Sequence, residues 1–134
     1  MRYLLDTNIC IYAIKEQPSS VIDRLRSSKA DDMAISAVTA FELWYGVHKS
    51  QHARKNSDAL EAFLGSLTVL GFEDADAREC GKLRARLEQL GTPIGPYDLQ
   101  IAAQAKRHRL TLVTNNDAEF RRIPGLAIEN WAAP

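Results

Sequence analysis

The sequence predicts an α/β fold in which a mainly parallel central sheet of four to five short strands is flanked by helices. The main observation is that short apolar segments alternate with longer helix-like segments along the chain, the pattern of strands joined by crossover helices. A second observation is a hydrophobic fraction of 46%, which is enough for a buried core. The 134 residues contain no repeat and no linker, so we expect a single domain over 1–134.

The first half of the chain is expected to contain two strands and four helices. The strands are at 2–6 and 33–36, and the helices at 7–15, 19–26, 37–48 and about 56–67. Pro18 and the two serines after it end the first helix and cap the second. Asp31 and Asp32 form a turn before the second strand, and a polar loop around 51–55 separates the last two helices.

The second half is expected to contain three strands and three helices. The strands are at 68–72, 110–114 and 126–129, the long helices at 74–90 and 97–108, and a turn with a short helix at 115–122. Gly91 is a natural cap for the end of the first long helix. The segment 92–96, with two prolines and a glycine, is expected to be a rigid loop.

Composition narrows the class of protein. The formal net charge is zero, which is weak evidence against non-specific nucleic-acid binding. No apolar run approaches the roughly 20 residues that a membrane span requires, and the acid at position 6 argues against a signal sequence. Cys10 and Cys80 lack the spacing of a zinc site and suggest no disulfide framework. We therefore expect a cytoplasmic protein with no membrane partner.

Acidic residues stand where the carboxyl ends of parallel strands are expected to meet, which is where such sheets bind ligands. Asp6 ends the first strand, Asp98 lies in the first turn of a later helix, and the segment Asn115-Asn116-Asp117-Ala118-Glu119 follows the fourth strand. Each also has a structural explanation: Asp6 can cap a helix, Asp98 can complement the helix dipole, and residues 115–119 suit a turn.

Glu42 is the least ordinary of these acids. It lies in the apolar segment 38–47, and no positively charged residue of that segment shares its helix face. A carboxylate on an apolar face is costly unless it is paired or binds a metal. The alternative is an amphipathic helix with Glu42 at the rim of its apolar face.

Taken together, the acids predict a metal site. Crowded carboxylates repel and raise one another's pKa, and a divalent cation removes that conflict. The ligands available are oxygens, with no Cys or His nearby, which favours Mg²⁺ or Mn²⁺ over zinc or copper. Mg²⁺ keeps several waters, so one or two direct carboxylates suffice and the remaining acids can hold its waters.

Four segments also resemble the motifs of a known family. They are Leu4-Leu5-Asp6-Thr7-Asn8, Thr39-Ala40-Phe41-Glu42-Leu43, Pro93-Ile94-Gly95-Pro96-Tyr97-Asp98 and Val113-Thr114-Asn115-Asn116-Asp117-Ala118-Glu119-Phe120. These resemble the PIN-domain ribonucleases and, within them, the VapC-type toxins of bacterial toxin–antitoxin pairs. The resemblance covers essentially the whole chain and implies a three-layer PIN-like fold.

The resemblance implies a role for each site residue. Asp6 and Asp98 would bind the metal directly, Glu42 would complete the acidic pocket, and Thr7 and Asn8 would steady the first acid or the substrate phosphate. Thr114, at the end of its strand, is a further candidate for substrate binding. The family's fourth acid falls on Asn116, which brings no charge, so Asp117 or Glu119 would have to compensate.

The resemblance further implies a Mg²⁺-dependent endoribonuclease that acts on structured RNA such as tRNA, a homodimer, and a VapB-like antitoxin as partner. The metal would activate a water, and Glu42 would orient that water or accept its proton. Basic side chains on the long helix and near the end of another are candidates for phosphate contacts: Lys82, Arg84 and Arg86 on the first, Lys106 and Arg109 on the second. They could equally form solvated helix faces.

Two alternatives remain at this point. The first is a degenerate PIN module that only binds its antitoxin or RNA, for which Asn116 is the best support. The second is a phosphoacceptor signalling domain, which would need a lysine directly after the fourth strand, where none stands. The aromatic residues Trp44 and Tyr45 could stack bases, but packing or dimer contacts are the more common role for such residues.

Overall fold

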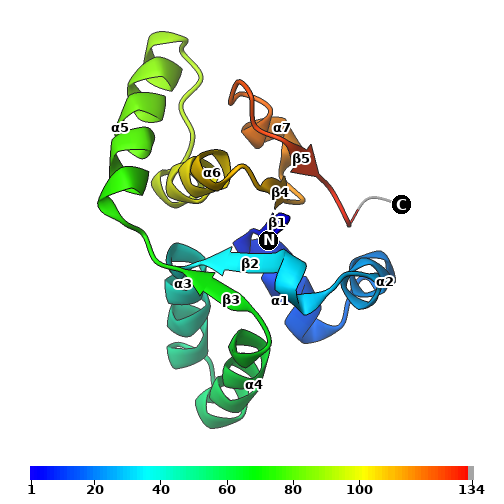
Figure 1. The fold of residues 1–134 in the computed structure, drawn as a ribbon. Helices are drawn as coiled ribbons and strands as arrows, with labels where there is room; N and C mark the ends of the chain where they lie inside the picture. The colour runs from blue at the N-terminus through cyan, green and yellow to red at the C-terminus, as the bar shows by residue number, and fades with distance from the viewer. Residues whose placement is uncertain (133–134) are drawn as a thin grey trace.

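Five parallel strands form the centre of the computed structural model, which describes residues 1–132. Their order across the sheet is β3-β2-β1-β4-β5. Their bounds are Tyr3–Leu5 for β1, Met33–Ser36 for β2, Thr68–Leu70 for β3, Thr111–Val113 for β4 and Ile128–Glu129 for β5. The predicted α/β class and parallel sheet are confirmed, with β1 at the centre (Figure 1).

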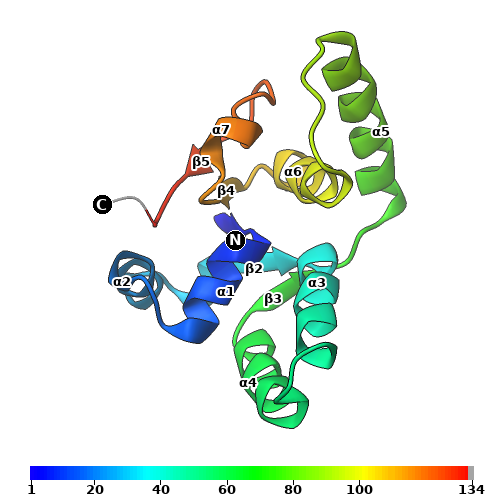
Figure 2. The same ribbon diagram turned by 180° about the vertical axis from the view of Figure 1, so that it is seen from behind.

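Helices connect the strands and cover both faces of the sheet. Their bounds are Thr7–Lys15 for α1, Ser19–Ser27 for α2, Ala37–His48 for α3, Ala53–Gly65 for α4, Asp74–Gln89 for α5, Pro96–His108 for α6 and Asp117–Phe120 for α7. In Figure 1, α3 and α4 lie in the lower half of the view with α1 and α2, whereas α5, α6 and α7 lie in the upper half. Figure 2, the view from behind, shows α1 between α2 and α3.

Two apolar cores lie on opposite faces of the sheet, because successive side chains of a strand point to opposite sides. Leu4 and Leu112 pack with α5, α6 and α7. Leu5 and Val113 pack with the first four helices. All four side chains are completely buried. The central strands β1 and β4 are therefore apolar on both sides of the sheet, which is typical of parallel strands that are covered on both faces.

The ends of the elements differ from the expectations by a few residues. The helix expected from about Asn56 begins at Ala53, and the turn before β2 is a short 3-10 helix, Ala30–Asp32. Gly91 closes α5 as predicted: its φ is +72°, its N–H bonds to the Glu88 carbonyl, and the next N–H, of Thr92, bonds to that of Leu87.

An ion pair ties the start of α5 to the end of α6. Asp76 is 0% exposed and accepts a hydrogen bond from Arg107, while its other oxygen accepts the Glu73 N–H at 2.8 Å. Burial opposes ionisation of Asp76, but these hydrogen bonds outweigh it and hold its pKa below 3.8. The pair therefore contributes fully to stability at neutral pH, and its contribution is lost as the pH falls through that lowered pKa.

Replacing Asp76 by Asn is expected to lower the free energy of unfolding by roughly 1–2 kcal/mol, because Arg107 loses a charged partner at a buried position. Denaturant unfolding followed by circular dichroism measures the change. Asp74→Asn is the matched control, since Asp74 forms an exposed ion pair with Arg78 that contributes little. Equal effects of the two substitutions would show that the buried pair has no special role.

No helix among residues 1–132 has both the length and the apolar character that a bilayer crossing requires.

Candidate active site at the carboxyl edge of the sheet

The strand register places Asp6 at the carboxyl edge. Leu5 pairs with Val113, so the next residues of β1 and β4, Asp6 and Thr114, lie side by side. The Asp6 N–H continues the ladder to the Val113 carbonyl at 3.0 Å. Asp6 also caps α1, since its Oδ1 accepts the Ile9 N–H at 3.0 Å. The cap expected from the sequence is therefore confirmed, and it holds the carboxylate at the head of the helix.

The Asp6 carboxylate is only 4% exposed. Burial raises its pKa above 3.8, and the neighbouring charge of Glu42 raises it further. Hydrogen bonds from the Thr114 hydroxyl and from the N–H groups of Ile9 and Asn8 act in the opposite direction. Each carboxylate oxygen has two lone pairs, so Asp6 keeps acceptor capacity beyond these bonds.

Glu42 comes from α3, which begins directly after β2 at the same edge. The Thr7 hydroxyl, from the first turn of α1, donates to Glu42 Oε1 at 2.8 Å. The Thr39 hydroxyl lies 3.2 Å from that of Thr7. Glu42 is thus held by a neutral donor, and its negative charge acts on Asp6.

Asp98 lies in the first turn of α6, where Gly95 is the cap residue and Pro96 the first helical residue. It is half-buried, and its pKa is raised to about 6. Burial is the largest cause, followed by the charges of Glu119, Asp6 and Glu42. Acids from four separate segments of the chain therefore lie close enough to repel one another at one edge of the sheet.

The segment after β4 separates the three candidates for a fourth acidic position. Glu119 Oε1 accepts the Gly95 N–H at 3.3 Å, beside the start of α6. Asn116 donates its Nδ2 to the other oxygen of Glu119 and so orients it. Asp117 forms an ion pair with Arg121 at 3.2 Å. Glu119 is therefore the acid of this segment that contributes to the cluster.

Replacing Glu119 by Gln is expected to lower the pKa of Asp98 from about 6 towards its usual value, because it removes the largest of the repelling charges. An NMR titration that follows the side-chain carboxyl carbon of Asp98 measures this directly. Asp117→Asn should leave the Asp98 pKa unchanged, since the Asp117 charge is paired with Arg121. A larger shift of the Asp98 pKa in Asp117→Asn than in Glu119→Gln would show that Asp117, and not Glu119, belongs to the acidic cluster.

The polar residues Thr7, Asn8 and Thr114 lie beside the acids, but their contacts differ in part from those expected. Thr114 is completely buried, its hydroxyl donates to Asp6, and it accepts the Asn116 N–H at 2.9 Å. It therefore positions Asp6 and is not accessible to a substrate, which corrects the expected substrate contact. Thr7 steadies an acid as expected, but that acid is Glu42. Asn8 supports Asp6 through its backbone N–H, and its side chain is exposed.

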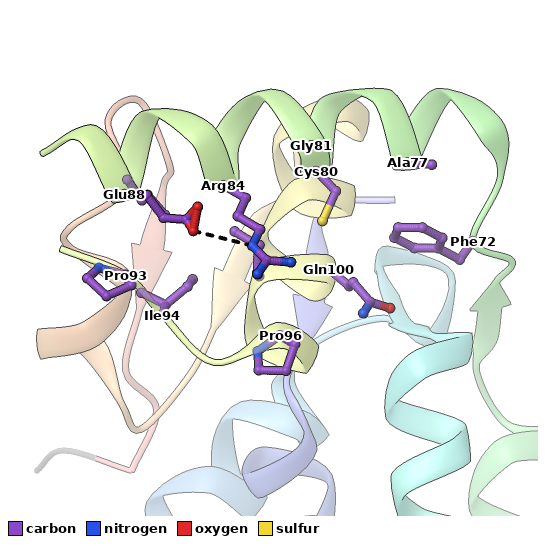
Figure 3. Close-up of a pocket in the computed structure, with 12 residues that line it drawn as sticks. Phe72, Ala77, Cys80, Gly81, Arg84, Glu88, Pro93, Ile94, Pro96 and Gln100 are labelled. Atoms are coloured by element: carbon purple, nitrogen blue, oxygen red, sulfur yellow. Dashed lines mark ion pairs between the residues drawn. The ribbon is translucent and has the colours of Figure 1, made fainter. Parts of the chain in front are cut away.

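Arg84 lies over a hollow between α5 and α6. Figure 3 shows its side chain reaching down from α5 towards α6, with a dashed line to Glu88, 3.6 Å away. The hollow measures about 480 Å³ and includes Pro96 and Gln100 from the first turns of α6. Arg84 is thus near the helix that carries Asp98, but among the ion pairs of residues 1–132 it pairs with Glu88 and not with Asp6, Glu42, Asp98 or Glu119.

Arg86 and Lys106 line a different hollow, which they share with Lys82 and Glu79. Lys106 is in the last turn of α6, eight residues after Asp98, so the two lie about 12 Å apart along the helix axis. The structure therefore does not bring these two cations together with the acids.

The donor set fits Mg²⁺ or Mn²⁺ in kind, since every acidic group at this edge is a carboxylate. Within residues 1–132, no Lys or Arg forms an ion pair with Asp6, Glu42, Asp98 or Glu119. The same residues contain no group of three or more His, Cys, Asp or Glu side chains arranged to hold an ion directly. Mg²⁺ itself needs only one or two direct carboxylates, because it keeps several of its waters.

Sequence reasoning missed Thr39, which is completely buried against the Thr7 hydroxyl. A signal was present, because Thr39 stands three residues before Glu42 and so shares its helix face. The packing expected for Trp44 is confirmed, whereas Tyr45 is 59% exposed and does not pack in the core.

The chain is similar to known proteins over nearly its whole length. The family model described as "PIN domain" matches residues 3–126. The chain is 42% identical to "tRNA(fMet)-specific endonuclease VapC" of Shigella flexneri, with 98% of this chain and 99% of that protein covered. It is 46% identical to "Ribonuclease VapC2" of Rickettsia felis, with 98% of both chains covered.

Solved structures are similar over the same length. A chain in the DNA-bound VapBC crystal structure from Salmonella typhimurium has a TM-score of 0.93 and 42% identity, with 98% of both chains covered. A chain of VapBC2 from Rickettsia felis, bound to a DNA fragment from their promoter, has a TM-score of 0.88 and 43% identity, with 98% of this chain and 99% of that chain covered.

Proposed function

The chain belongs to the PIN-domain family and, within it, to the VapC ribonucleases, and on that premise we propose that it is the Mg²⁺-dependent endoribonuclease of a toxin–antitoxin pair. The observation that carries the proposal is the cluster of Asp6, Glu42, Asp98 and Glu119 at one sheet edge, with the pKa of Asp98 raised to about 6 by burial and by the other three charges. A catalytically degenerate module has no reason to keep such a repulsive arrangement.

Each residue has a proposed role. Asp6 and Asp98 would hold the metal directly, and Glu42 and Glu119 would accept hydrogen bonds from waters at the site. When bound, Mg²⁺ or Mn²⁺ supplies a water of lowered pKa and compensates the charge on the phosphate. Thr7 fixes Glu42 through Oε1, which leaves Oε2 to accept a proton from the attacking water. The water oxygen then bonds to phosphorus, the bond to the leaving ribose oxygen breaks, and that oxygen takes a proton from solvent.

The substrate proposed is RNA, and the Shigella flexneri relative, named for tRNA(fMet), favours a tRNA. Arg84 is the best placed of the basic candidates for a phosphate contact, because the hollow it lines reaches the first turns of α6. The partner proposed is a VapB-type antitoxin, since the similar solved structures are VapBC complexes. We further propose that the protein is a homodimer and acts in the cytoplasm.

The test is cleavage of total RNA by the purified protein, with the new ends mapped by sequencing. We expect discrete ends in Mg²⁺ or Mn²⁺ and none in EDTA, because metal-free carboxylates repel the phosphate. Adding back Mg²⁺ should restore cleavage. Equal cleavage in Mg²⁺ and in EDTA would rule out the metal-dependent mechanism, and no cleavage with either metal would favour the degenerate module.

A further inference from the structure

Two exposed aromatic side chains contact each other beside the acids. Phe41 is 53% exposed and Tyr97 is 45% exposed. Their ring centroids are 5.5 Å apart and the ring planes meet at 76°, an edge-to-face contact between α3 and α6. Single exposed apolar residues are common on proteins, but this pair comes from two helices and is held in a defined geometry.

The pair is adjacent to the carboxylates in sequence and in space. Phe41 immediately precedes Glu42, and Tyr97 immediately precedes Asp98. Neighbouring residues on a helix differ by about 100° in direction, so each ring lies on the helix face next to that of its carboxylate. The Glu42 charge acts on Asp98, and the two rings touch, so both pairs bridge the same gap between α3 and α6.

A phosphate contact such as that proposed for Arg84 holds the RNA backbone and leaves the bases free. Within residues 1–132, no basic side chain pairs with the four acids, and Arg86 and Lys106 line a hollow elsewhere. Aromatic rings bind nucleic acid without charge, because every base offers a flat face for stacking. A base is joined to its phosphate through a single sugar, so a base next to the phosphate at the acids must lie close to them.

We propose that Phe41 and Tyr97 form an aromatic platform for a base next to the cleaved phosphate; because the rings meet at 76°, the base stacks on the face of one ring and contacts the edge of the other. The inference rests on the proposed function, since it takes RNA as the substrate and the acids as the place of cleavage. Phe41 and Tyr97 are thereby substrate-binding residues that hold the nucleotide in position for the acids. Stacking needs a base free of its own partners, so the bound nucleotide is unpaired.

The experiment uses single-stranded RNA that carries the fluorescent base 2-aminopurine, whose emission falls when it stacks. Binding and cleavage are measured in Mg²⁺ for the unchanged protein and for Phe41→Leu and Tyr97→Leu. We expect both variants to lose the quenching and to raise KM roughly tenfold, with a smaller effect on kcat. Tyr97→Phe keeps a ring and should behave as the unchanged protein. Tyr45→Leu is the matched control, because Tyr45 is exposed on α3 and lies against Lys49.

Unchanged quenching and KM in both leucine variants would overturn the platform. So would a loss of binding that accompanies a change in molecular mass by light scattering, which would make the pair a contact with a second copy of the chain. If quenching depends on the two rings but the protein cleaves no RNA, the proposed function is wrong and the platform stands. If the protein cleaves RNA but binding does not depend on the rings, the platform is wrong and the proposed function stands.

Discussion

Replacing Asp6 by Asn is expected to lower RNA cleavage about a thousandfold while the fold is kept. Asn and Asp are equally good helix caps, so the bond from the Ile9 N–H to the side chain can be retained. The substitution removes only the negative charge and with it one of the two proposed direct metal ligands. Cleavage rates in Mg²⁺ and the unfolding midpoint, measured on the same preparation, separate the two effects.

Two further variants complete this test. Asp6→Ala removes the cap as well as the charge, so it should also lower the stability of the fold by about 1 kcal/mol. Asp117→Asn neutralises a nearby acid that is paired with Arg121, and it should cleave at close to the unchanged rate. If Asp6→Asn cleaves RNA normally in Mg²⁺, the assignment of Asp6 as a metal ligand is wrong.

Replacing Asp98 by Asn is expected to abolish cleavage and yet stabilise the metal-free protein. The pKa of Asp98 is about 6 in the folded chain against a usual 3.8. Between these values the folded state binds more protons than the unfolded state, so stability rises as the pH falls. The loss of stability caused by ionised Asp98 is complete above pH 6 and absent below pH 3.8. Because Asp98 is half-exposed, water screens part of it, and we expect a gain of about 1 kcal/mol at pH 7.

The measurement is thermal unfolding in EDTA between pH 5 and pH 8. The unchanged protein should gain stability from pH 7 to pH 5 relative to Asp98→Asn, which lacks the titrating group. At pH 7 the variant should melt a few degrees higher. Mg²⁺ should then stabilise the unchanged protein more than the variant, because only the former keeps both direct ligands. A variant less stable than the unchanged protein at pH 7 would contradict a repulsive cluster.

Much of the fold and part of the site could be predicted from the sequence. The apolar strands and the helix signals fixed the element order, because burial on both faces leaves a clear pattern. Asp6 could be placed at the carboxyl edge because it directly follows a buried strand. Glu42 stood out because no cation of its own helix segment could pair with it.

The remainder depends on side-chain direction and on contacts between distant segments. The sequence could not choose among Asn116, Asp117 and Glu119, since the choice is made by the Gly95 N–H and by Arg121. Thr114 looked available to a substrate, and only the pairing of β1 with β4 shows that it is buried against Asp6. Lys106 was a poor candidate already on the expected helix 97–108, since it stands at the end opposite to Asp98, about 12 Å away along the axis.

Titration with Mn²⁺, followed by NMR, tests the central claim most directly, because the ion broadens the signals of nuclei close to it. At low Mn²⁺ we expect the amide signals around residues 6, 42, 98 and 119 to broaden first, and those at the start of α5 to remain sharp. The same titration of Asp6→Asn should need far more Mn²⁺. Broadening centred on another region, or spread evenly over the surface, would show that the four carboxylates do not form one cation site.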